Sequence, residues 1–467
     1  MKNKRREFLK LTGMAGIGLA GARILPGYTS GPANVQEDKI DPAPEWAQNA
    51  DMFTHASWYV TSDKPDTQNP VWKGYDIELK DVSVERIVRL SAGNGFKKKT
   101  EQVLEVKDGR FDGTGIKGVS LISHVPVSKA AFQQAHEQGF RVIPYVHFTD
   151  IHSFYADQEV FLFQHPEVLL KDSEGKFVHL PMGGSDGTNT DRVYRLMVCT
   201  NNPSYCKLSL DYIKKIMDWG ADGLFIDNTN KRRECFANKS TKTVNPEFGP
   251  YVHEHIYPEN THNYAFTRFL ESVRALVKGY GNDKIVVLNS GIGEEFQKHG
   301  DICMWESFIY SWAWEGRRDN WTNIKARANA NDWYLKAGRR ITALSTLNPS
   351  RKEVKEDSYW AFCAARLVDF IWWASLQGTG AEELYQVHLG KTLQSLQETD
   401  QVAYRTFENG VLVLNDSSQT MTKTISLPKE FRHRQLFDLY DDKKPMKVAK
   451  GQIKVMIPMQ SARIFIS

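Results

Sequence analysis

Cysteine is scarce in this sequence and the net charge is close to zero, and both facts restrict what the protein can be. Its 467 residues include five cysteines, at positions 199, 206, 235, 303 and 363, and none of them form a CxxC pair. This spacing gives no support for a disulfide scaffold or a zinc knuckle. Lysine and arginine number 60 against 56 acidic residues, a net charge of +4. Such a balance produces no large field of one sign, so composition does not favour a nucleic-acid partner.

The signatures of several enzyme classes are also missing. The sequence contains no HExxH metal motif and no phosphate-binding P-loop, and no strand expected below is followed by GxGxxG. His253-Glu254-His255 has the look of a metal pair, but no third ligand stands at a known spacing. We therefore expect no metal and no cofactor. Beyond residue 22, no run is apolar enough to cross a membrane.

The first 30 residues follow the order of zones in an export signal, and a linker starts within them. A basic start leads into Arg5-Arg6-Glu7-Phe8-Leu9-Lys10, then a weakly apolar run to residue 22 that ends in the small residues Ala20-Gly21-Ala22. The arginine pair resembles the twin-arginine export signal of bacteria. A basic cytosolic tail is the alternative. We expect a bacterial protein that is periplasmic or secreted, with no membrane span in its mature form.

Eight short apolar runs alternate with helical patterns between residues 45 and 398. Their nearly continuous apolar character is typical of parallel strands that are buried on both faces. Eight strand–helix units in about 340 residues predict a (β/α)8 TIM barrel, with a doubly wound α/β sheet as the alternative. The expected strands are 57–60, 118–122, 141–148, 223–227, 285–289, 302–306, 341–345 and 370–375.

Residues 399–467 have a different pattern, in which short alternating segments replace the helical periods. Turn pairs such as Asn409-Gly410 and Asn415-Asp416 separate these segments. The pattern predicts a small all-β sandwich domain after the barrel. Its expected strands are 402–407, 411–415, 422–427, 435–440, 452–457 and 463–466.

Two carboxylates stand at the ends of predicted barrel strands, where (β/α)8 barrels carry their chemistry. Alternation along the fourth strand directs Asp227 into the barrel mouth, and Glu306 ends the sixth strand in the same way. A glycosidase needs such a pair, one group to protonate the leaving oxygen and one to attack or to activate water. The structural alternatives are a helix cap for Asp227 and an ion pair with Arg317 or Arg318 for Glu306.

Other residues near the expected strand ends could bind a sugar. Aromatic residues make up 12% of the chain, more than a core requires, and their rings can stack on a flat apolar ligand face. Glu294 and Glu295, after the fifth strand, are the alternative acid. The candidate substrate-binding residues are Trp58, His147, Asp150, Asn228, Asn289, Trp305, Trp312, Trp314 and Arg317.

Two stretches carry a family resemblance. The run from Gly220 to Asn228 resembles the fourth-strand motif of retaining TIM-barrel glycoside hydrolases related to α-galactosidases and dextranases, and His165-Pro166-Glu167-Val168 resembles a second motif of theirs, with Val168 in place of Trp. The resemblance implies Asp227 as nucleophile and Glu306 as acid/base. The C-terminal segment is similar to the β domain of amylase-like glycosidases.

The sequence thus predicts an exported, retaining glycoside hydrolase acting on an oligo- or polysaccharide. Two alternatives remain open at this point. One is a catalytically silent barrel that binds a glycan, and the other is a metal-dependent hydrolase on the same fold.

Export can be tested on the arginine pair. Arg5→Lys combined with Arg6→Lys keeps the positive charge, yet it should retain the precursor in the cytoplasm because the pair is the recognised feature. Cell fractionation and immunoblotting measure this, with Lys2→Arg combined with Lys10→Arg as a control of equal charge. Unchanged export of the double lysine variant would remove the twin-arginine interpretation.

Overall fold

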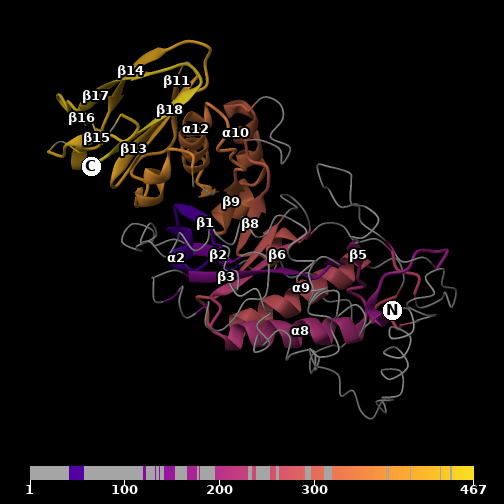
Figure 1. Cartoon of the computed structure of the whole chain (residues 1–467). Helices are drawn as coiled ribbons and strands as arrows, with labels where there is room; N and C mark the ends of the chain where they lie inside the picture. Colours follow the sequence, from indigo (N-terminus) through magenta and orange to yellow (C-terminus); the bar gives the residue numbers. More distant parts are fainter. Residues whose placement is uncertain are drawn as a thin grey trace, which may run out of the picture.

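The structure is a computed structural model, and its architecture is drawn in Figure 1. The structure describes residues 41–56, 119–122, 132, 136, 141–152, 166–175, 178, 195–229, 234–237, 253–258, 262–289, 296–309, 318–374, 376, 378–399, 401–431, 433–441 and 444–467.

Eight parallel strands close into a barrel, which confirms the predicted fold and excludes the doubly wound sheet. In order around the barrel they are β1 (Met52–Ala56), β2 (Val119–Ile122), β3 (Arg141–His147), β6 (Gly223–Asp227), β7 (Ile285–Asn289), β8 (Ile302–Trp305), β9 (Arg340–Leu344) and β10 (Ile371–Trp373). The first barrel strand begins at Met52, five residues before the predicted start at residue 57. Residues 57–60 lie outside the described part of the chain.

Alternation along these strands separates an inner from an outer layer of apolar side chains. Ile143, Phe225, Val287 and Met304 belong to the cluster that fills the barrel. Their neighbours along the strands, such as Leu224, pack against the surrounding helices instead. Both faces are therefore apolar, which is why the strands read as continuous runs.

Helices surround the barrel. They are α2 (Glu45–Gln48), α8 (Pro203–Asp218), α9 (His262–Gly279), α10 (Trp321–Ala330), α11 (Asp332–Lys336) and α12 (Val354–Leu367), with 3-10 turns at Pro166–Val168, Gln297–His299, Glu382–Gln386 and Lys429–Phe431. The side chain of Asn202 caps α8 by accepting from the amides of Ser204 and Tyr205 at 2.8 and 3.1 Å. In the described part of the chain, no helix combines the length and apolarity that a bilayer crossing requires.

Buried aspartates fix the N-terminal ends of the strands that carry the site. We call this end of the barrel its lower end. Asp222, just before β6, accepts from the backbone amide of Val142 at 2.8 Å. Asp301, just before β8, accepts from the amide of Val286 at 2.9 Å. Burial by itself would raise the pKa of Asp222, but its hydrogen bonds to the Val142 amide and to His136, together with the charge of Lys284, outweigh this effect and lower the pKa. Each aspartate ties its own strand segment to a neighbouring strand.

The C-terminal region is antiparallel, as its alternating sequence predicts. A six-stranded sheet has the order β11 (Gln397–Thr399), β12 (Val402–Phe407), β13 (Gly410–Asn415), β18 (Ser461–Ile466), β15 (Leu436–Asp438) and β16 (Lys444–Met446), and β14 (Met421–Ser426) pairs with β17 (Gln452–Ile457). The short strands β11 and β16 escaped the sequence analysis. We call residues 397–467 the β domain.

Helix α12 lies between the barrel and the β domain (Figure 1). Leu412 and Leu414 on β13 share the core that contains the residues of this helix, whereas Val411 and Val413 face the β14–β17 pair. Because α12 is covered on both sides, nearly all of its residues are buried. The barrel and the β domain therefore share one hydrophobic core.

This shared core predicts a single cooperative unfolding transition. Leu414→Ala removes a fully buried side chain from it and should cost about 2–5 kcal/mol of unfolding free energy. Met456→Ala, at an exposed position of β17, should change it by less than about 0.5 kcal/mol. Urea denaturation followed by tryptophan fluorescence measures both variants. Two separate transitions, of which Leu414→Ala shifts only one, would show that the barrel and the β domain unfold independently.

Candidate active site

Three polar side chains gather at the C-terminal ends of neighbouring barrel strands. We call this end of the barrel its upper end. Asp227 ends β6, Asn289 ends β7, and Glu306 follows the last residue of β8. Each is two residues beyond an inward-facing apolar residue: Phe225, Val287 and Met304. The alternation that fills the barrel with apolar groups therefore carries these three into its mouth.

The amide group of Asn289 bridges the two carboxylates. Its Nδ2 lies 2.5 Å from Asp227 Oδ1 and 2.9 Å from Glu306 Oε2. These two oxygens can be no farther apart than the two distances laid end to end, about 5.4 Å. Asn289 is almost fully buried, so the bridge lies in a region from which water is largely excluded.

Asp227 receives further hydrogen-bond donors. The hydroxyl of Tyr145 donates to its Oδ2. The backbone amide of Asn228 donates to Oδ1 at 2.8 Å, and the side-chain amide of Asn228 approaches Oδ2 at 3.3 Å. Donors directed at both oxygens stabilise the negative charge of this carboxylate and fix its orientation.

Tyr145 is a site residue that the sequence analysis missed. It lies on β3, on the same side of the strand as the inward-facing Ile143, and its ring stacks on Phe225 at 5.4 Å. Phe225 in turn meets Trp373 edge-on at 5.3 Å. An aromatic floor therefore lies beneath Asp227. The signal was available, because Tyr145 has the same strand parity as His147, which was singled out.

Asn228 connects the strand end to the loop after β3. Its φ of 56° lies in the left-handed region, which asparagine tolerates better than most residues. From there its side-chain amide reaches Asp150 Oδ1 at 3.4 Å, and the same oxygen accepts from the hydroxyl of Thr149 at 2.7 Å. Asp150 is buried, and it begins the short strand β4 (Asp150–His152), which pairs with β5 (Arg195–Met197).

Trp305 requires a correction. We expected it to line the mouth, but it belongs to the outer layer of the barrel and is only 6% exposed. Its ring meets Phe308 and Phe370 at 5.1 and 6.1 Å, and the guanidinium of Arg327 lies 4.1 Å from the ring centre. The cause is its parity, because it follows the inward-facing Met304 directly.

The other residues named from the sequence fall into three groups. His147 ends β3 beside Asp227, but only its backbone belongs to the description. Arg318, one of the two expected partners of Glu306, pairs with Asp357 at 3.2 Å. Trp58, Glu294, Glu295, Trp312, Trp314 and Arg317 lie outside the described residues.

Comparisons with known proteins give no family for the chain. No protein-family model matches it, and no curated protein matches it in sequence. Among solved structures, a debranching enzyme of Nostoc punctiforme gives a TM-score of 0.47 at 10% identity, covering 91% of this chain and 100% of that one. A maltogenic α-amylase, AmyB of Thermotoga neapolitana, gives 0.48 at 11%, covering 79% and 95%. The glycoside hydrolase domain of PelA from Pseudomonas aeruginosa gives 0.37 at 14%, covering 56% and 88%. At these values the likenesses carry no argument about activity.

The backbone of Asn228 gives a test of the site's local geometry. Asn228→Ala and Asn228→Gly both remove the side-chain amide, but only alanine is strained at a φ of 56°. The alanine variant should therefore be less stable than the glycine variant by roughly 0.5–1 kcal/mol, after allowing for the larger entropy of unfolded glycine. Denaturant unfolding of the two variants side by side measures the difference. An alanine variant as stable as the glycine variant would contradict the left-handed geometry.

Proposed function

We propose that this protein is a retaining glycoside hydrolase, with Asp227 as its nucleophile and Glu306 as its acid/base. The observation that carries the proposal is the limit of about 5.4 Å on the separation of their bridged oxygens. Retaining enzymes hold their carboxyl groups about 5–5.5 Å apart, and inverting enzymes need roughly 6.5–9.5 Å to admit a water molecule. The distances at Asn289 fit the first range and fall short of the second.

The surroundings of the two carboxylates support the division of roles. Asp227 accepts from Tyr145, Asn289 and Asn228, which fixes its orientation as a nucleophile requires. In the first step its oxygen attacks the anomeric carbon, while Glu306 gives its proton to the departing oxygen. In the second step Glu306 takes a proton from water, the water oxygen attacks the same carbon, and Asp227 leaves as a carboxylate.

Asn289 contacts both groups and suits both steps. Negative charge leaves Asp227 as the glycosyl–enzyme bond forms, and at the same time it appears on Glu306. An amide nitrogen with one hydrogen for each carboxylate can follow this transfer without moving. The nearby aromatic floor of Tyr145, Phe225 and Trp373 excludes water from below and strengthens these electrostatic interactions.

The substrate would be a carbohydrate outside the cytoplasm, since the first 30 residues resemble an export signal. A catalytically silent glycan-binding barrel would have no need for two carboxylates connected by a single amide. The donor set around Asp227 therefore favours an enzyme over a binding protein.

Substrates that differ in leaving group separate the two roles. Asp227→Asn should abolish turnover of every glycoside because no nucleophile remains. Glu306→Gln should slow substrates with poor leaving groups by about 10²–10⁴-fold and affect activated aryl glycosides far less, because these need little protonation. Asp211→Asn, at an exposed position of α8, is the matched control and should be fully active.

The measurements are kcat/KM on a panel of aryl glycosides and oligosaccharides, together with NMR of the first-formed anomer. Equal loss on both kinds of substrate would exclude Glu306 as the acid and favour Glu294 or Glu295. An inverted product would disprove the retaining mechanism.

A further inference from the structure

A second cluster of reactive side chains lies in the loops above the barrel, apart from the two carboxylates. Cys199 lies two residues after β5, in the connection between the barrel strands β3 and β6. We call this connection the loop after β3. Cys235 and His255 come from the loop after β6, and His262 is the first residue of α9. From the sequence we expected no metal, because His253-Glu254-His255 has no partner at a known spacing. The intervals between these four residues are too long and irregular to match any familiar motif.

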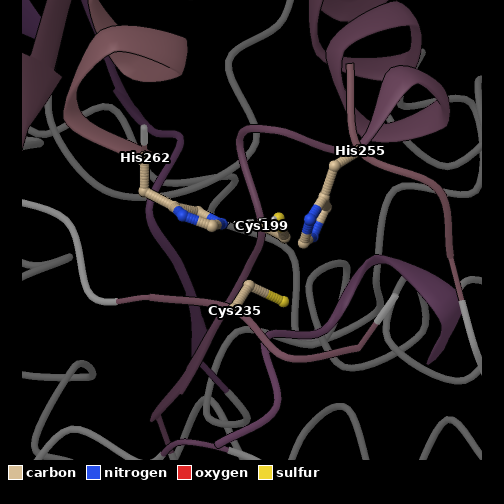
Figure 2. A group of neighbouring side chains, drawn as sticks. All are labelled: Cys199, Cys235, His255 and His262. Carbon is tan, nitrogen blue, oxygen red and sulfur yellow. Dashed lines mark hydrogen bonds between the residues drawn. The ribbon is translucent and has the colours of Figure 1, made fainter. Parts of the chain in front are cut away.

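The four side chains converge on one point (Figure 2). One ligand atom from each lies within 4.8 Å of all the others. Cys199 Sγ, for example, is 3.9 Å from His262 Nε2. Bond lengths of about 2.3 Å to sulfur and 2.0–2.1 Å to nitrogen around a tetrahedral zinc ion place ligand atoms roughly 3.3–3.8 Å apart. A small inward movement of the side chains would therefore complete the coordination.

The hydrogen bonds of His262 orient it as a metal ligand. Its Nδ1 lies 2.9 Å from a carboxylate oxygen of Glu234, to which it donates. This bond leaves Nε2 as the atom that points at the thiols, and a carboxylate behind a histidine is the usual support of a metal-bound imidazole. The proton therefore lies on the side of the ring away from the cluster.

The burial and hydrogen bonding of the other three residues also favour a bound ion. Cys199 and Cys235 are buried free thiols. The Nδ1 atom of His255 is buried and has no hydrogen-bond partner among the residues that the structure describes. A buried polar atom without a partner is costly.

We propose that Cys199, Cys235, His255 and His262 bind one zinc ion as a structural Cys2His2 site. Two thiolates and two imidazoles in a tetrahedral arrangement select Zn²⁺ over harder cations. Four protein ligands leave no open position for water or substrate, which distinguishes a structural from a catalytic zinc. Two thiolates also neutralise the charge of the ion in this buried setting.

His253 is a neighbour of the site. Its Nε2 lies 3.5 Å from Cys235 Sγ and 3.2 Å from His255 Nε2, while its Nδ1 donates to the carbonyl of Glu167 at 2.6 Å. This last bond ties the loop after β6 to the loop after β3. His253 therefore supports the pair of loops beside the ion.

The zinc ion would fasten the loop after β3 to the loop after β6. A short path leads from it to the carboxylates. The amide of Val198, next to Cys199, donates to the carbonyl of Thr149 at 3.0 Å, and Thr149 donates to Asp150, which Asn228 contacts. Loss of the ion should loosen the loops and, through Asn228, one wall of the site.

Metal analysis of the full-length protein tests the proposal without any substrate, so its outcome is independent of the glycosidase hypothesis. The protein is purified from zinc-supplemented cells, dialysed against metal-free buffer and analysed by mass spectrometry of its metals. We expect one zinc per chain in the parent protein. The control Cys363→Ser, which removes a buried thiol of α12 far from the site in sequence, should also hold one zinc per chain. Cys235→Ser and His262→Ala should lose the zinc. Glu234→Gln should keep the fold and bind zinc about 10–100-fold more weakly in a chelator competition.

Two measurements on the unsubstituted protein remain informative even if a variant fails to fold. Replacing zinc with Co²⁺ should give the visible absorption of a tetrahedral site together with thiolate-to-cobalt charge transfer. Titration of thiols after denaturation should count all five cysteines. Protein without zinc, zinc retained by Cys235→Ser, or a titration two thiols short, which would indicate a Cys199–Cys235 disulfide, would each overturn the proposal.

Discussion

The amide of Asn289 holds two carboxyl groups next to each other, and the site depends on that contact. Two carboxylates about 5 Å apart would repel each other by about 3 kcal/mol at an effective dielectric constant near 20 if both were ionised. Hydrogen bonds from one amide nitrogen to both of them offset this repulsion. The arrangement works only if β6, β7 and β8 keep their register, because a shift of one residue would turn Asp227 or Glu306 to the outer layer.

Features far from the mouth maintain that register. Gly223 allows β6 to lie close to β7, since a Cβ atom there would come 2.1 Å from the carbonyl oxygen of Ile285. Asp222 and Asp301 accept backbone amides of neighbouring strands at the lower end of the barrel. Each of these residues looks unremarkable in the sequence, but a substitution would move the strands that carry the carboxylates.

The upper end of the barrel is organised by loops in addition to strands. Asp150 and Asn228 bring the loop after β3 against the end of β6. The proposed zinc site joins the same two loops farther out, with Cys199 from one and Cys235 from the other. In this arrangement the barrel sets the positions of the carboxylates and the loops set the walls around them. The β domain contributes at a distance, by covering α12.

The sequence by itself determined the barrel, the β domain and the strand ends that carry Asp227 and Glu306, because periodicity and alternation are local properties of the chain. The first strand begins at Met52 and not at the predicted residue 57, because an apolar run buried on both faces gives no sign of where the strand begins. Tyr145 and Trp305 are different, because strand parity relative to His147 and Glu306 already separates the inside from the outside of the barrel at both positions. Tertiary structure alone gathered Cys199, Cys235, His255 and His262. Their long, irregular intervals carry no signal, because what brings them together is the packing of two loops and not the geometry of a single turn.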